Sequence, residues 1–309
     1  MSDLSIPKSI ESPLPLGHPR TLGPLGEVGP LSLGCWRMTG NDRENSALVA
    51  TAVDLGMTLI DNADVYGLDW GGTHFGQCEE ALGRVFAAAP GLRERVVLAT
   101  KGGIIPGVPY NSDPAYLERA VEASLARMGV DHVDLYQVHR PDTVTHPADV
   151  AAAFASLHAR GLVRAFGVSN HTPHQTRALL AHARVPVVST QPEFSVTHLD
   201  PMRDGTLDLC METGLVPLAW SPLAGGRLAT GDGLRPEVLS ILDEIAEREG
   251  ATRAAIAVAF VLAHPSAPVA IVGTQQPARL TELARAAHVT LTRRDVYRLV
   301  VASDGVPLP

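Results

Sequence analysis

The sequence has few of the features that mark disulfide-rich, membrane-spanning or secreted proteins. It contains only three cysteines, Cys35, Cys78 and Cys210, and their wide spacing fits neither a disulfide framework nor a zinc site. It has no run of about 18 apolar residues, the length that spans a bilayer. The first 20 residues carry prolines and charges where a secretory signal needs an unbroken apolar stretch. We therefore expect a protein of a reducing compartment, the cytoplasm.

An excess of basic residues is also missing. The chain has 25 Lys and Arg against 33 Asp and Glu, a net charge of −8, whereas nucleic acids and anionic membranes are bound by basic surfaces. We expect neither as a partner. Its 309 residues, 45% of them hydrophobic, are enough for one large α/β domain with a sizeable core. A small molecule is the expected partner, and monomer and homo-oligomer both stay open.

The two ends of the chain differ from its middle. Residues 1–19 include four prolines and show little periodicity, which predicts a flexible arm before a single domain at 20–309. The turn-rich segment 20–30 predicts a hairpin, and the pattern of 292–302 predicts an additional helix near the C-terminus.

Between these ends, short β-type runs alternate with helical patterns. Residues 113–129 show the helical signature: Asp113 can cap the N-terminus, Pro114 suits the first turn, and Gly129 permits a left-handed stop. The predicted strands lie at 31–35, 57–61, 95–100, 133–138, 163–168, 186–190, 215–220 and 269–273.

Such alternation predicts a parallel sheet, either closed or open and doubly wound. An open sheet that binds dinucleotides would show GxGxxG after its first strand, and LGCWRMTG at 33–40 imitates that motif poorly. Eight strands favour closure. We predict a single-domain α/β fold, a (β/α)8 TIM barrel with an N-terminal hairpin and an extra C-terminal helix.

Four residues that can move a proton follow three consecutive predicted strands. They are Asp61, Tyr66, Lys101 and His139, and strand C-termini are where TIM barrels carry their active sites. A phenol has a pKa near 10, and we expect the ammonium of Lys101 to lower it. Asp61 would hold Lys101, while His139 orients a substrate carbonyl. Each residue alone has an ordinary structural role, and only the combination predicts proton transfer to a carbonyl oxygen.

The motifs DNADVYG, ATKGG, QVHR, GVSNH and WSPLAGG together resemble the aldo-keto reductase superfamily, from about residue 20 to 305. The resemblance implies a barrel that binds NADP(H) without a Rossmann fold, with Asp61, Tyr66, Lys101 and His139 as the catalytic tetrad. The insert LDWGGTHFGQ after Tyr66 and the C-terminal tail are similar to a bacterial oxidoreductase branch, many of whose members have no assigned substrate.

The same resemblance implies a set of cofactor contacts. Ser169, Asn170 and Gln191 would bind the nicotinamide carboxamide, and the indole of Trp220 would stack on its ring. The loop SPLAGGR would bind the pyrophosphate. The residues implied there are Ser221, Leu223, Gly225 and Arg227.

A segment beginning at Gly273 resembles the part of the family that holds the adenosine 2′-phosphate. Thr274, Arg279 and Glu282 would contact that end of the cofactor. The chain departs from the family pattern at two positions: Gly273 stands where many members have Lys, and Leu283 stands where they have Asn. NADP(H) is favoured through Arg279, and NAD(H) stays open as an alternative.

Substrate contacts are harder to predict. Trp36, Trp70 and Tyr110 are the candidate pocket aromatics. No strand ends in the His-x-His or carboxylate set of a metal-dependent barrel hydrolase, so we expect no metal.

The sequence thus predicts an NADP(H)-dependent oxidoreductase that interconverts an aldehyde or ketone, sugar-like substrates included, and its alcohol. A cofactor-sensing, non-catalytic binding subunit is the alternative, and a metal-dependent hydrolase is a third. The natural substrate and the physiological direction stay open.

Overall fold

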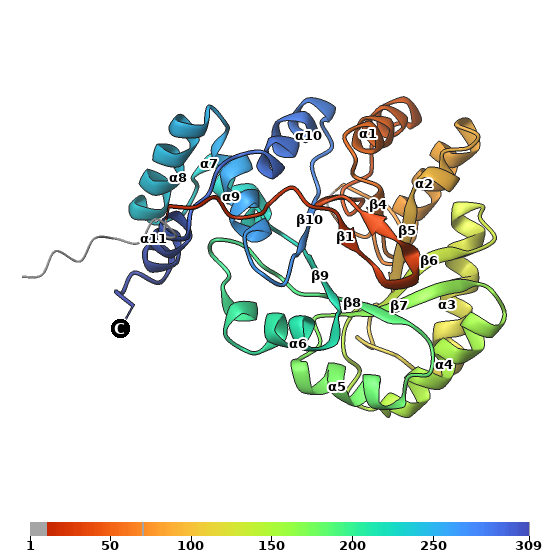
Figure 1. The fold of residues 1–309 in the computed structure, drawn as a ribbon. Coiled ribbons are helices and arrows are strands. Elements are labelled where there is room, and N and C mark those ends of the chain that lie inside the picture. The colour runs from red at the N-terminus through yellow and green to blue at the C-terminus, as the bar shows by residue number, and fades with distance from the viewer. Residues whose placement is uncertain (1–10, 70, 309) are drawn as a thin grey trace, which may run out of the picture.

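The computed structural model describes residues 11–69 and 71–308. Eight parallel strands close into a barrel in the order β10-β3-β4-β5-β6-β7-β8-β9, with helices around it (Figure 1). The predicted fold is confirmed. The barrel strands are β3 (Leu31–Gly34), β4 (Leu59–Asp61), β5 (Val97–Gly102), β6 (Val133–Val138), β7 (Val163–Ser169), β8 (Val187–Gln191), β9 (Val216–Ala219) and β10 (Val269–Val272).

The helices between these strands begin and end where the local sequence specifies. In α3, Asp113 accepts the backbone N–H groups of Ala115 and Tyr116, and Gly129 ends the helix at φ 64°. The α-helices are α1 (Asp42–Asp54), α2 (Gln77–Ala88), α3 (Pro114–Met128), α4 (Pro147–Ala159), α5 (Pro173–His182), α6 (Thr206–Thr213), α7 (Arg227–Thr230), α8 (Pro236–Glu249), α9 (Arg253–Leu262), α10 (Pro277–Ala284) and α11 (Arg293–Asp304).

A short hairpin closes one end of the barrel. Its strands β1 (Arg20–Thr21) and β2 (Glu27–Val28) pair antiparallel, as the turn-rich segment predicts. Leu22 and Val28 pack into the apolar cluster inside the barrel. The hairpin therefore seals the end where the strands begin.

The described part of the predicted arm, residues 11–19, is more closely packed than the sequence suggests. Leu14 donates its N–H to the carbonyl of Leu291 at 2.8 Å, and Leu16 is 3% exposed. The prediction of a loose arm is thus wrong for this part, because a backbone hydrogen bond and a buried leucine attach it to the domain. Residues 1–10 lie outside the described residues.

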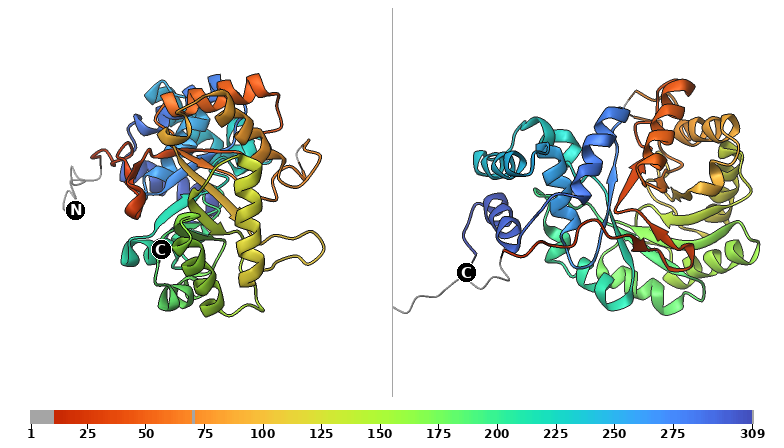
Figure 2. Two further views of the ribbon diagram at one scale, coloured as in Figure 1. Left: turned by 90° about the vertical axis from the view of Figure 1, so that its right-hand side faces the viewer. Right: turned by 45° about the horizontal axis from the view of Figure 1, so that its top comes forward.

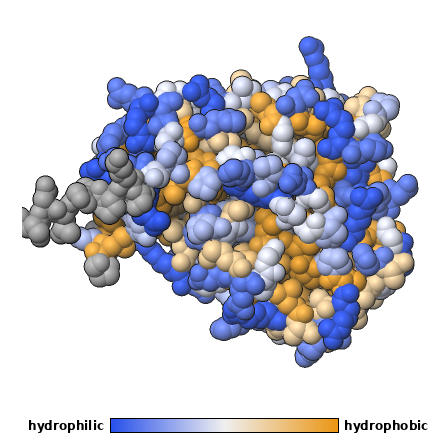
Figure 3. Space-filling model, viewed as in Figure 1, coloured by the Kyte–Doolittle hydropathy of each residue, from blue (hydrophilic) through white to orange (hydrophobic). Residues whose placement is uncertain are grey.

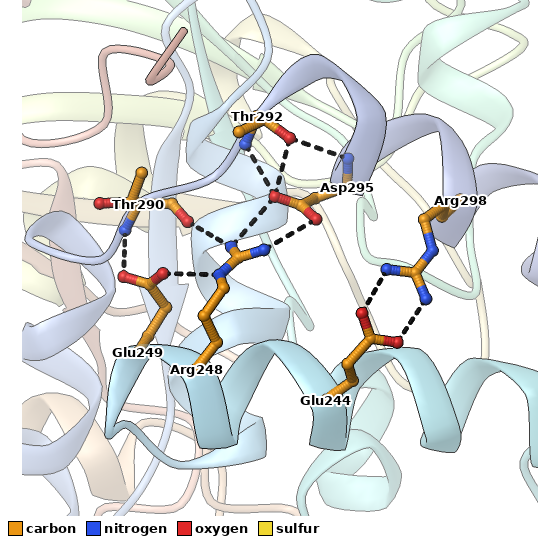
Figure 4. Close-up of polar contacts among 7 residues, drawn as sticks. All are labelled: Glu244, Arg248, Glu249, Thr290, Thr292, Asp295 and Arg298. Atoms are coloured by element: carbon orange, nitrogen blue, oxygen red, sulfur yellow. Dashed lines mark hydrogen bonds and ion pairs between the residues drawn. The ribbon is translucent and has the colours of Figure 1, made fainter. Parts of the chain in front are cut away.

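The helix predicted at 292–302 is α11, and it lies outside the barrel against α8. Arg248 of α8 donates to both carboxylate oxygens of Asp295, at 3.0 and 3.1 Å, and Arg298 binds Glu244 at 2.7 Å (Figure 4). Bidentate pairs of this kind fix the orientation of both partners. The extra helix is thereby held along the length of α8.

The two ends of the barrel differ. Seen from the hairpin side, the surface is a mixture of hydrophilic side chains and apolar patches (Figure 3). The longer loops, residues 62–69 with 71–76 and residues 103–113, project from the opposite end (Figure 2, left). That end carries the C-termini of the strands, where barrel enzymes hold their sites.

Candidate active site

One cavity of about 1220 Å³ opens at the C-terminal ends of the strands. Its wall contains Asp61, Tyr66 and His139, and all twelve residues predicted to contact a cofactor. Those twelve are Ser169, Asn170, Gln191, Trp220, Ser221, Leu223, Gly225, Arg227, Gly273, Thr274, Arg279 and Glu282. The structure therefore brings together residues that are more than 200 positions apart in the chain.

A buried ion pair joins Asp61 of this wall to Lys101 behind it. Nζ of Lys101 donates to Oδ2 of Asp61 at 2.6 Å and to the carbonyl of Asn62 at 2.8 Å, and the two side chains are 0% and 3% exposed. Burial by itself lowers the pKa of Lys101, but the charge of Asp61 outweighs it and the pKa is raised overall. Lys101 is a fixed ammonium ion.

Tyr66 lies between this ammonium and His139. Its ring centroid is 5.0 Å from Nζ of Lys101 and 5.7 Å from the His139 ring centroid. Burial raises the pKa of Tyr66 to about 12, although the charge of Lys101 lowers it. The sequence-based expectation of a lowered pKa is therefore wrong. Loss of hydration destabilises the phenolate more than the nearby ammonium stabilises it, so the phenol keeps its proton at neutral pH.

His139 is held neutral. Burial lowers its pKa well below the usual value, and the charges of Lys101 and Arg140 lower it further. Its backbone N–H donates to the carbonyl of Gly102 at 2.9 Å. Its Nδ1 has no hydrogen-bond partner in the part of the chain that the structure describes. A neutral imidazole can still donate from one ring nitrogen.

The other oxygen of Asp61 is bound by two amides. Gln191 donates from Nε2 to Oδ1 at 3.0 Å, and Gln137 does so at 3.3 Å. Gln191 is one of the predicted cofactor contacts, whereas Gln137 is not among the predicted site residues. An uncharged amide within the β-type run VDLYQV is the signal that could have identified it, because buried polar groups require partners.

The nicotinamide end of the cavity is preassembled by hydrogen bonds. Trp220 donates from Nε1 to Oδ1 of Asn170 at 3.0 Å, and Asn170 donates from Nδ2 to Ser169 Oγ at 2.8 Å. Asn170 holds a left-handed backbone at φ 57°. The guanidinium of Arg140 lies 5.9 Å from the Trp220 ring centroid. The predicted carboxamide and stacking groups therefore form one connected unit.

The opposite end is formed by the loop after β9 and by the start of α10. Ser221, Ala224, Gly225 and Gly226 all have positive φ, a backbone that turns successive amides to one side. Arg227 follows, donating from Nε to the carbonyl of Ala224 at 3.2 Å.

The three candidate substrate aromatics differ in their position relative to the cavity. Trp36 lines the cavity and donates from Nε1 to Oδ1 of Asp69 at 3.1 Å. Tyr110 does not line it: its backbone bridges Ile104, which turns the loop back and leaves the ring 39% exposed. Trp70 lies outside the described residues. The structure adds Arg37 and Arg140 to the lining.

A further carboxyl of the DNADVYG motif is buried nearby. Asp64 is 1% exposed, and within residues 11–69 and 71–308 its Oδ1 has no hydrogen-bond partner. A Cβ on Gly102 would lie 2.2 Å from Tyr136 Oη and 3.1 Å from Asp64 Oδ2, so only glycine fits between these groups. Burial and the charge of Glu79 raise the pKa of Asp64 well above its usual range.

This raised pKa makes a prediction about stability. The folded protein binds the Asp64 proton more tightly than the unfolded chain does. The contribution of Asp64 to the free energy of unfolding is therefore largest below its pKa in the unfolded chain, about 4, and is lost as pH rises. We expect Asp64→Asn to raise the free energy of unfolding by about 1–3 kcal/mol at pH 8 and less at pH 5. Urea unfolding at both pH values measures this, with exposed Asp131→Asn as the control. Equal effects at both pH values would contradict it.

None of the helices in residues 11–69 and 71–308 is long and apolar enough to cross a membrane. Among the same residues, no group of three or more His, Cys, Asp or Glu is placed to hold a metal ion.

Comparison with known proteins gives consistent matches over nearly the whole chain. The family model described as "Aldo/keto reductase family" matches residues 30–303. A 6-dehydroglucose reductase of Novosphingobium aromaticivorans is 43% identical over 313 residues, covering all of both chains. Oxidoreductase YdhF of Escherichia coli is 34% identical, covering 94% of this chain and 98% of its own.

Two solved structures are similar in fold. A thermostable aldo-keto reductase, Tm1743, in complex with epalrestat superposes with a TM-score of 0.79 at 29% identity, covering 92% of this chain and 99% of its own. An aldo/keto reductase from Klebsiella pneumoniae in complex with NADP and acetate gives 0.77 at 26% identity, covering 95% and 98%.

Proposed function

This chain belongs to the aldo/keto reductase family, and from that premise we propose that it is an NADPH-dependent reductase of aldehydes or ketones. The observation that carries the proposal is the arrangement at the cavity wall. A phenol that keeps its proton lies 5.0 Å from a fully buried ammonium, which is itself paired to a carboxylate. Such a group is a general acid backed by a fixed positive charge.

The residues of the cavity fit a nicotinamide dinucleotide. Asn170, Ser169 and Trp220 form a preassembled polar and aromatic unit at one end. Arg227 and Arg279 line the other end, where guanidinium groups suit phosphates. When bound, the cofactor supplies the hydride that the carbonyl carbon receives. The chain's own residues supply the rest of the chemistry.

Those residues have separable tasks. Tyr66 donates its Oη proton to the carbonyl oxygen, and Lys101 stabilises the negative charge that remains on the phenolate. Asp61 fixes Lys101 through the 2.6 Å contact. His139, neutral because burial lowers its pKa well below the usual value, donates a hydrogen bond that orients the carbonyl. In the reverse direction the same phenolate accepts the proton from an alcohol.

The substrate end of the cavity favours a hydroxylated carbonyl compound. Arg37, Asp69 and Arg140 line it together with the indole of Trp36, a mixture of charged groups and flat apolar surface typical of sugar sites. Two relatives are named 6-dehydroglucose reductase, at 43% and 33% identity. We infer that a sugar-like aldehyde is the substrate class.

A carbonyl panel tests this function. We expect NADPH consumption, followed by loss of nicotinamide absorbance, with sugar aldehydes turned over at higher kcat/KM than apolar aldehydes of similar size. Tight NADPH binding without turnover of any aldehyde, ketone or sugar would contradict the proposal and favour a cofactor-sensing subunit.

Cofactor preference is a separate prediction. We expect Arg279→Met to weaken NADPH binding by about 10- to 100-fold and NADH binding by less than about threefold, because only NADPH carries a 2′-phosphate for a charged hydrogen bond with Arg279. Quenching of Trp220 fluorescence measures both affinities. Arg285→Met, which removes an exposed arginine outside the cavity lining, is the matched control. An equal loss for both cofactors would contradict the phosphate contact.

A further inference from the structure

A layer of polar side chains crosses the interior of the barrel just below the cavity. Lys101 of β5 pairs in register with Gln137 of β6, Gln137 with Gly167 of β7, and Gly167 with Ser189 of β8. Lys101, Gln137 and Ser189 are all 0% exposed. The interior one layer further from the cavity is apolar, built from residues such as Leu135 and Ala165. The polar layer lies at the level of the ion pair.

Glycine at position 167 makes room for this layer. A Cβ on Gly167 would lie 2.2 Å from Ser189 Oγ and 3.2 Å from Cγ of Gln137. Because the first distance is far below any normal contact, a side chain at 167 would displace Ser189 and crowd Gln137. Because Gly167 has no side chain, there is space beside it for the Gln137 amide.

Both ends of that amide are engaged. Its Nε2 donates to Asp61 Oδ1 at 3.3 Å, and its Oε1 accepts from Ser189 Oγ at 3.4 Å. The carboxylate of Asp61 only accepts, so it selects the orientation in which the NH2 group faces it; the Ser189 hydroxyl, which can donate or accept, then donates to Oε1. The opposite orientation would place an amide oxygen against Asp61 and repel its charge.

The two carboxylate oxygens of Asp61 thus have different hydrogen-bond partners. Oδ1 accepts from Gln137 and Gln191, and Oδ2 accepts from Lys101. Gln191 also lines the cavity, whereas Gln137 does not. Gln137 has no contact with the space that a substrate or cofactor fills, so any effect it has on the reaction passes through Asp61.

We propose that Gln137 is a positioning residue for the reaction, which keeps Oδ2 of Asp61 turned toward Lys101 by donating to Oδ1. The proposal rests on the function proposed above, because Asp61 and Lys101 matter only if Tyr66 transfers a proton. A packing role alone would affect folding and leave the turnover of the folded protein unchanged.

The split between kcat and KM separates the two roles. An Asp61 that turns away no longer fixes Lys101 beside Tyr66, so the chemical step slows while substrate binding is kept. We expect Gln137→Met to lower kcat by about 10- to 100-fold and to change KM for the carbonyl by less than about threefold. The titratable groups near Asp61 are Lys101, Tyr66 and Cys35, and His139 faces Lys101. Burial raises the pKa of the Cys35 thiol well above its usual range, so Cys35 stays protonated.

Two controls accompany this variant. Ser32→Ala removes another fully buried donor, which binds the carbonyl of Leu59 at 2.7 Å on the neighbouring strands; it should lower stability and leave the kcat of the folded protein within about twofold of wild type. NADPH affinity, measured by fluorescence, should stay within about twofold in Gln137→Met. A folded Gln137→Met protein with the wild-type kcat would overturn the proposal.

A second substitution tests the proposal if Gln137→Met fails to fold. Gln137→Glu keeps the size of the side chain and donates to Asp61 only when protonated. We expect its activity to rise as pH falls, because only the protonated carboxyl at position 137 can donate to Asp61. A pH profile identical to that of the wild type would overturn the proposal. Absence of wild-type turnover across the whole carbonyl panel would instead overturn the proposed function, and this inference with it.

Discussion

Tyr66→Phe is expected to lower kcat by about 10²- to 10⁴-fold, the range that a positioned general acid contributes. NADPH affinity should change by less than about twofold, because the phenol hydroxyl is not one of the predicted cofactor contacts. Tyr66 keeps its proton at neutral pH, since burial raises its pKa to about 12. The variant removes that proton and leaves the ring, so the loss appears in kcat rather than in binding.

Steady-state kinetics at saturating NADPH measures this effect, and fluorescence titration checks the affinity. Tyr110→Phe is the matched control, because Tyr110 is 39% exposed and does not line the cavity. It should keep the wild-type rate. A Tyr66→Phe protein within about threefold of wild-type kcat would show that the proton comes from another group.

Lys101→Met is expected to be damaging to both stability and turnover. It leaves the Asp61 carboxylate 2% exposed and without its cation, and breaking a buried pair in this way costs about 3–5 kcal/mol. It also removes the charge that stabilises the Tyr66 phenolate, so kcat should fall at least as far as in Tyr66→Phe. Urea unfolding and steady-state kinetics measure the two effects.

A double variant separates these losses. Asp61→Asn with Lys101→Met removes both charges, and we expect it to recover most of the stability and none of the activity. Arg95→Met breaks an ion pair whose side chains are 59% and 73% exposed, and it should cost less than about 1 kcal/mol. If Lys101→Met were as stable as Arg95→Met, the claim that the buried ion pair stabilises the fold would be contradicted.

The eight strands could be predicted from the sequence because each is a short apolar run between clear helix signals. Observed strands begin or end within about two residues of the predicted ones, which is the usual uncertainty of element boundaries. Asp113 and Gly129 specify the ends of α3 by local chemistry alone, and the structure shows both. Local signals of this kind can be interpreted from the sequence because they depend only on neighbouring residues in the chain.

Properties that depend on the surroundings could not be predicted in the same way. The pKa of Tyr66 is raised because desolvation exceeds the effect of Lys101, and the extent of burial is not visible in a motif. Tyr110 lies in the expected loop, but the bridge to Ile104 turns it away from the cavity. The surroundings of Gln137 and Asp64 include residues of other strands, which come together only in the closed barrel.

A single-turnover experiment tests the central claim most directly. The protein loaded with one equivalent of NADPH is mixed rapidly with an excess of a sugar aldehyde, and the nicotinamide absorbance is followed in the wild type and in Tyr66→Phe. The account predicts loss of one reduced nicotinamide per chain in the wild type and a rate about 10²- to 10⁴-fold slower in the variant. Equal rates, or no oxidation of bound NADPH by the wild type, would contradict it.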